Sequence, residues 1–167
     1  MIPFYLSSLV FGAWAVAVAV CDCRSRRVPN TLVGAGLVAA LAAALPHAGP
    51  AHIGIGQALA AAAVGLAALM PFFVFGMMGA ADVKVFAVLG AWCGMQPLVG
   101  LWVVASLAAF VHALAMLIAL RARASVAASR PARLVTVGPR RGTPYAACLS
   151  VPALAWLALQ LMSGWPK

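Results

Sequence analysis

Acidic side chains are almost absent from this sequence of 167 residues. It contains no glutamate, and its only aspartates are Asp22 and Asp82, against eleven lysines and arginines. Charged residues make up 8% of the chain, whereas an ordinary soluble domain has about 25%. The shortage of charge excludes a typical soluble globular domain. It also means that any catalytic carboxylate must be one of two residues.

Polar segments are scarce as well, because 66% of the residues are apolar and the mean hydropathy is +1.08. A helix needs about 20 mostly apolar residues to cross a bilayer. The apolar runs lie at 2–20, 31–45, 53–76, 84–95, 98–120 and 145–163. We therefore predict an all-α, polytopic membrane bundle of about six transmembrane helices, forming one domain over residues 1–167. No basic residue precedes the first run, so we expect it to be a retained span instead of a cleaved signal peptide.

One turn in this arrangement follows from length alone. Residues 85–120 would form a helix of about 54 Å, and the hydrocarbon core is only about 30 Å thick. The chain must therefore double back, and residues 94–97, with the sequence GMQP, are the predicted turn.

The cations predict an orientation in the membrane. With six spans and the N-terminus outside, ten of the eleven cations fall on the cytoplasmic side, and only Lys167 falls opposite. The ten are Arg24, Arg26, Arg27, Lys84, Arg121, Arg123, Arg130, Arg133, Arg140 and Arg141. We expect residues 121–142 to form a cytoplasmic loop, in which part of the segment can be a helix lying on the membrane surface. Because the cations border apolar segments, we expect anionic lipid headgroups as partners, and not nucleic acid.

The same topology places both aspartates at the cytoplasmic ends of spans. Two carboxylates at one depth can form a dyad, in which the ionised member takes a proton from water and the protonated member polarises a carbonyl. A second interpretation is also open. Asp22 is followed by arginines and Asp82 by Lys84, so each could form an interfacial ion pair worth about 0–1 kcal/mol.

The first motif surrounds Asp22. Residues 21–30 read CDCRSRRVPN, in which an Asp ends a span and leads through Arg27 to Pro29 and Asn30. This segment resembles the first motif of prepilin peptidases, which have an Asp, then basic residues, then Ile/Val-Pro-Asn. From position, we expect Pro29 to shape the turn and Asn30 to cap a helix beginning at Thr31.

The second motif surrounds Asp82. Residues 79–84 read GAADVK and are similar to the Gly-x-Gly-Asp motif of membrane aspartyl proteases, with the Val-Lys common in prepilin peptidases. The sequence departs from that motif at Ala81, where the family usually has Gly. We expect Gly79 to help bend the loop before Asp82. Lys84 is two positions from Asp82, so it would not share a helix face with it.

A third match lies at residues 142–146, GTPYA, where Pro144 and Tyr145 resemble the Pro-Tyr element that opens the last span of these enzymes. The resemblance implies a membrane aspartyl endopeptidase that cleaves the leader peptide of type IV or Flp prepilins at the cytoplasmic face of the bacterial inner membrane. Asp22 and Asp82 would activate the water, and the apolar helix of a prepilin or pseudopilin would be the partner.

Longer members of the family carry paired CxxC motifs and also methylate the new amino terminus. This chain has four cysteines and no CxxC pair, so no metal, no other cofactor and no methyl transfer are predicted. The short form resembles the peptidases of tight-adherence or Flp pili. Two alternatives remain, namely a small ion-coupled transporter and a non-catalytic pilus or secretion assembly factor, the latter favoured only by Ala81. Nothing in the sequence indicates an oligomeric state.

Overall fold

The computed structural model describes residues 2–127 and 145–162, and the side chains of 122–127 are outside the description. Six helices form this part of the chain, and it has no strand. They are α1 (Ile2–Ser25), α2 (Asn30–Ala44), α3 (Ile55–Val74), α4 (Ala80–Cys93), α5 (Met95–Ala127) and α6 (Tyr145–Met162). The predicted all-α fold with six helices is confirmed.

The six helices differ in whether they can cross a bilayer. Four of the described helices, α1, α3, α5 and α6, are long and apolar enough to do so. Helix α2 has 15 residues and α4 has 14, which correspond to about 22 and 21 Å of helix. Both are shorter than a hydrocarbon core of about 30 Å. The chain is therefore a polytopic helical membrane protein in which two of the six helices are short.

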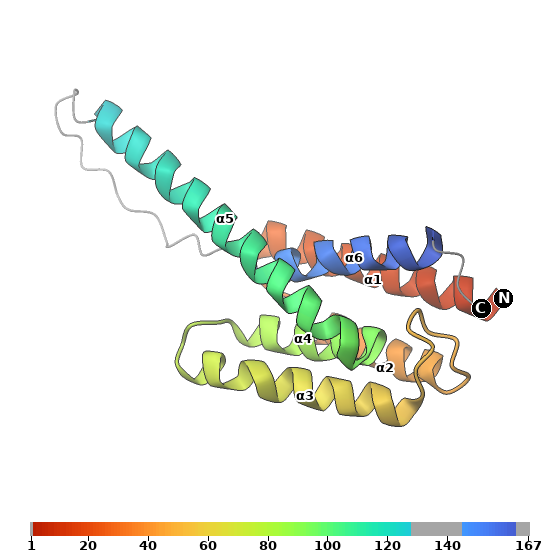
Figure 1. Cartoon of the computed structure of the whole chain (residues 1–167). Helices are drawn as coiled ribbons and strands as arrows, with labels where there is room; N and C mark the ends of the chain where they lie inside the picture. The colour runs from red at the N-terminus through yellow and green to blue at the C-terminus, as the bar shows by residue number, and fades with distance from the viewer. Residues whose placement is uncertain (1, 128–144, 163–167) are drawn as a thin grey trace.

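Helix α4 lies at the centre of the bundle. It packs along α3 as an antiparallel hairpin and also contacts α2, α5 and α6, while α1 runs beside α6 (Figure 1). Nine of its fourteen residues are buried, including Phe86, Leu89 and Trp92. Because neighbours surround α4, its two ends are held at fixed positions in the bundle. Its first turn contains Asp82.

Two glycines permit the closest approaches between helices. A Cβ at Gly90 would lie 2.5 Å from the carbonyl oxygen of Ala61, so α3 and α4 touch backbone to backbone there. A Cβ at Gly36 would lie 2.2 Å from Nε1 of Trp14, whose N–H donates to the carbonyl of Leu32 at 2.9 Å. Small residues allow this packing between membrane helices, where burial from water supplies little of the driving force.

The turn predicted at residues 94–97 is confirmed at its first residue. Gly94 has φ +77°, which separates α4 from α5 by one residue. The first part of the segment predicted as a loop, residues 121–127, is helical, because α5 continues through Ala127. Residues 121–127, RARASVA, contain no Gly or Pro and are compatible with helix, so no local signal ends it. In Figure 1 the second half of α5 extends away from the other helices.

Replacing Gly90 by Ala should destabilise the bundle, because the new methyl would overlap the Ala61 carbonyl. We expect a loss of about 1–3 kcal/mol in the free energy of unfolding, the usual cost of overpacking. Thermal unfolding of the purified protein in detergent measures it. Gly56→Ala is the matched control, since a Cβ there meets nothing within 4 Å. Equal melting temperatures for the two variants would contradict the close α3–α4 contact.

Candidate active site

Asp22 lies in the last turn of α1, and its side chain is buried at 7% exposure. Its Oδ2 accepts a hydrogen bond of 2.9 Å from the backbone N–H of Ala147. Ala147 is 125 residues further along the chain, in the first turn of α6. This contact joins the first and last helices.

Asp82 is the third residue of α4, and its side chain points back toward the start of the helix. Its Oδ2 accepts from the backbone N–H of Gly79 at 3.2 Å, and Gly79 is the N-cap residue. A Cβ at Gly79 would lie 3.1 Å from the same oxygen, which explains why a residue without a side chain suits this position. A second interaction with Asp82 comes from the backbone N–H of Ala146.

The N-terminus of α6 is therefore shared by the two aspartates. Ala146 and Ala147 are consecutive residues of its first turn, where backbone N–H groups have no partner within the helix. The helix dipole also places partial positive charge there, which stabilises nearby carboxylates. One helix end brings Asp22 and Asp82 together, and the charge of Asp22 acts on Asp82.

Asp82 precedes the apolar run 84–95 and lies outside the four long spans. Burial raises the pKa of its carboxyl group, and the charge of Asp22 raises it further, to about 6. The N–H groups of Gly79 and Ala146 act in the opposite direction. Two carboxyl groups in this arrangement can share one proton in mildly acidic solution.

The interpretation of the aspartates as interfacial ion pairs finds no support in the described part of the chain. There, both carboxylates interact with backbone N–H groups and with each other's charge, and neither is paired with Lys or Arg. Lys84 instead donates from Nζ to Oδ1 of Asn30, at 2.9 Å. The prediction that Asn30 caps the second helix is wrong, since Pro29 occupies the cap position and no side chain caps this helix.

A cavity of about 660 Å³ opens beside Asp82. It is bounded by the α3–α4 loop, the first turn of α6 and the middle of α5, and most of its lining is apolar. Tyr145 lies at its edge, and the Tyr145 hydroxyl is 3.1 Å from Oγ of Ser106 in α5. The cavity could therefore hold an apolar segment with one end against the carboxylate. The side chains that line it include Phe72, Met77, Met78 and Trp102.

The other predicted motif residues have varied positions. Arg27 is exposed, and its carbonyl accepts from the hydroxyl of Ser25 at 3.1 Å. Ala81 lies in α4 without a positive φ, so its Cβ meets no backbone penalty. Gly76 has φ +70° and supplies the bend before α4. Pro144 lies outside the described residues, as do the arginines at positions 130, 133, 140 and 141.

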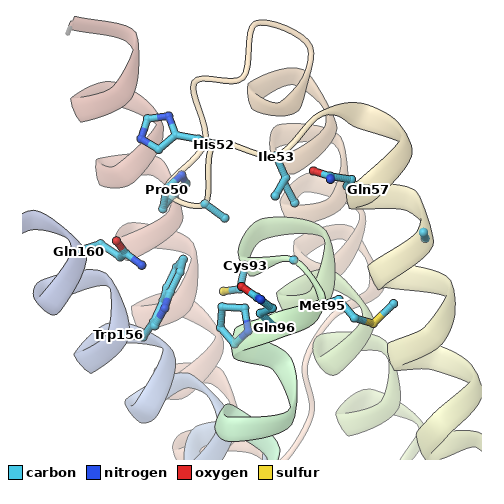
Figure 2. Close-up of a pocket in the computed structure, with 13 residues that line it drawn as sticks. Pro50, His52, Ile53, Gln57, Cys93, Met95, Gln96, Trp156 and Gln160 are labelled. Atoms are coloured by element: carbon cyan, nitrogen blue, oxygen red, sulfur yellow. The ribbon is translucent and has the colours of Figure 1, made fainter. Parts of the chain in front are cut away.

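A second cavity, of about 710 Å³, lies at the opposite end of the bundle (Figure 2). It exists because α4 ends at Cys93 and turns at once into α5, while α3 and α6 continue on either side. Gln57, Gln96 and Gln160, which are all the glutamines in the sequence, line it together with His52. It contains neither carboxylate, so it is separate from the candidate active site.

Residues missed by sequence reasoning are Ala146, Ala147 and Ser106. The first two act through backbone N–H groups, and the Pro-Tyr element that opens the last helix was the available signal for them. Ser106 had none. Among the residues that the structure places, no group of three His, Cys, Asp or Glu could hold a metal ion.

Residues 9–117, more than half of the chain, match the type IV leader peptidase family. The matched segment includes both aspartates and ends before α6. No curated protein and no solved structure matches the chain.

Replacing Ala147 by Pro should destabilise the protein, because Pro has no N–H to donate to Asp22. The lost hydrogen bond to a charged group costs about 1.5–3 kcal/mol, and Pro adds to this loss because it disfavours the helical conformation of Ala146 before it. Unfolding of the purified protein in detergent measures this loss. Ala147→Ser keeps the N–H and should unfold like the wild type. If both variants unfold alike, Asp22 does not depend on this amide.

Proposed function

The chain belongs to the type IV leader peptidase family, and from this membership we propose that it is a membrane aspartyl endopeptidase that removes the leader peptide of prepilins. The observation that supports this proposal most directly is the position of Asp22 and Asp82. They are the only acidic residues in the sequence, they come from helices far apart in the chain, and both interact with the first turn of α6.

The proposed reaction is hydrolysis of one peptide bond by this pair. The ionised carboxylate takes a proton from a water molecule, whose oxygen attacks the scissile carbonyl carbon. The protonated carboxyl group donates to the carbonyl oxygen and stabilises the negative charge that develops there. The tetrahedral intermediate then breaks its C–N bond, the leaving nitrogen takes up a proton, and a carboxylic acid and an amine are released. The roles of base and acid belong to the coupled pair, not to fixed residues.

The cavity beside Asp82 supports a proposal for the substrate. Its lining is apolar at Phe72, Met77 and Trp102, and it becomes polar at Asp82 and Tyr145. Such a surface suits a peptide whose scissile bond meets water while the neighbouring apolar helix stays in lipid. Small pilins or pseudopilins of the tight-adherence or Flp type are the proposed substrates.

We propose the inner membrane as the location, with the N-terminus outside and the active site facing the cytoplasm. The support is the distribution of charge, since ten of the eleven cations fall on the side of the two aspartates in this topology. Anionic headgroups near these cations are the proposed lipid partners. Methyl transfer is not part of the proposal.

The two alternative functions have less support. Ion-coupled transporters place their carboxylates near the bilayer midplane, at interrupted helices. Here Asp22 lies in the last turn of α1 and Asp82 in the first turn of α4. A non-catalytic assembly factor was favoured only by Ala81, and the helical backbone at that residue removes the reason to expect a defective site.

Asp22→Asn and Asp82→Asn should each abolish cleavage, because Asn keeps the shape of Asp but neither ionises nor exchanges a proton. A loss of at least about a hundredfold is expected, the usual contribution of a general acid or base. The assay follows full-length prepilin in cells that co-express an Flp-type substrate. Gln57→Ala, at the far cavity, is the control and should cleave normally, with membrane insertion checked for every variant. Continued cleavage by either inserted Asn variant would exclude the aspartyl mechanism.

Raising the pH above about 6 should slow cleavage. Because the pKa of Asp82 is raised to about 6, the pair keeps its shared proton below this pH and loses it above. Without that proton no carboxyl group can donate to the scissile carbonyl, so the rate should fall toward tenfold per pH unit. Initial rates of the purified enzyme in detergent test this. A rate that stays constant on the alkaline side would show that the reaction does not need the shared proton.

A further inference from the structure

A hydrogen bond joins the two segments that carry the aspartates. Nζ of Lys84 donates to Oδ1 of Asn30 at 2.9 Å, across 54 positions of sequence. Lys84 follows Asp82 by two residues in the first turns of α4. Asn30 is the first residue of α2, directly after the turn that leaves Asp22 and the end of α1.

This hydrogen bond restrains the turn between α1 and α2, which follows Asp22 in the chain. Residues 26–29 are not helical, and Arg26 has φ +55°, an uncommon value for a residue with a side chain. Asp22 is held from one side by the Ala147 N–H. The bond from Lys84 to Asn30 fixes the other end of this turn against α4, the helix that carries Asp82.

The positions of the two residues suggest other roles, namely helix capping for Asn30 and pairing with a carboxylate for Lys84, but both side chains make this contact instead. Asn30 caps no helix, since Pro29 occupies the cap position without a side-chain bond. Lys84 pairs with a neutral amide oxygen instead of a carboxylate, so it does not neutralise the pair. Neither residue lines the cavity beside Asp82, so neither is placed to contact a substrate held there.

We propose that Asn30 and Lys84 are a positioning pair, whose hydrogen bond sets the relative placement of Asp22 and Asp82. The inference rests on the proposed peptidase function. The hydrogen bond contributes to the rate by holding the two aspartates in place. Neither the positive charge of Lys84 nor contact with the substrate makes this contribution.

The test is a double-mutant cycle with Asn30→Ala, Lys84→Met and the double variant, using the purified full-length protein and an Flp-type prepilin. Asn30→Ala leaves the net charge, and hence the topology signal, unchanged. Each single variant should lower kcat about fivefold, as expected for one exposed hydrogen bond, and leave KM within about twofold. The double variant should be no slower than either single one. Losses that multiply, or losses in KM alone, would overturn the proposal.

An exchanged pair, Asn30→Lys with Lys84→Asn, provides the rescue experiment. It keeps the net charge and reverses donor and acceptor across the same gap, so kcat should recover to more than half of the wild-type value. If the exchanged pair is as slow as Lys84→Met, the position of the charge matters and the hydrogen bond does not. Failure of this inference is distinct from failure of the peptidase function. In the first case Asn30→Ala cleaves at the wild-type rate while Asp22→Asn does not, and in the second the wild type itself does not cleave.

Discussion

The positions of two carboxyl groups at the ends of helices α1 and α4 constrain much of this structure. A carboxylate removed from water needs hydrogen-bond donors or opposite charge. Here the donors are backbone N–H groups, two from the first turn of α6 and one from the N-cap residue of α4. Backbone N–H groups carry no formal charge and do not titrate near neutral pH. They can hold a pair of carboxyl groups without neutralising it, which is the state that acid–base chemistry requires.

The rest of the bundle places these donors. Helix α4 is short and surrounded, and the contact at Gly90 sets it against α3 at backbone distance. The buried residues of α4 follow its first turn, from Val83 to Cys93, and their packing holds the helix that carries Asp82. Helix α1 reaches the same place because it runs beside α6. Because α4 is short, a cavity remains at the opposite end of the bundle, and the three glutamines line it (Figure 2).

Membership in the type IV leader peptidase family agrees with this arrangement, although the matched residues 9–117 stop before α6. The last helix nevertheless completes the site, since it provides the Ala146 and Ala147 amides and the Tyr145 ring at the edge of the cavity. Residues that act through their backbone are hard to recognise in a sequence, because every residue type except proline supplies the same N–H group. Tyr145 could be anticipated from its motif, whereas its partner Ser106 could not.

The sequence by itself determined the helices, because runs of apolar residues long enough for a bilayer allow few other structures, and it limited the acids to Asp22 and Asp82. It also located the turn at Gly94, since a longer helix would not fit the membrane. It did not indicate where α5 ends, because residues 121–127 lack a helix-breaking residue. It also misassigned Asn30, whose local position favours a helix cap. Only the tertiary structure decided that Asn30 bonds to Lys84 and that both aspartates meet α6, because these contacts join residues 54, 64 and 125 positions apart. Local sequence fixes helices through neighbouring residues, but which helix ends meet depends on the packing of the whole bundle.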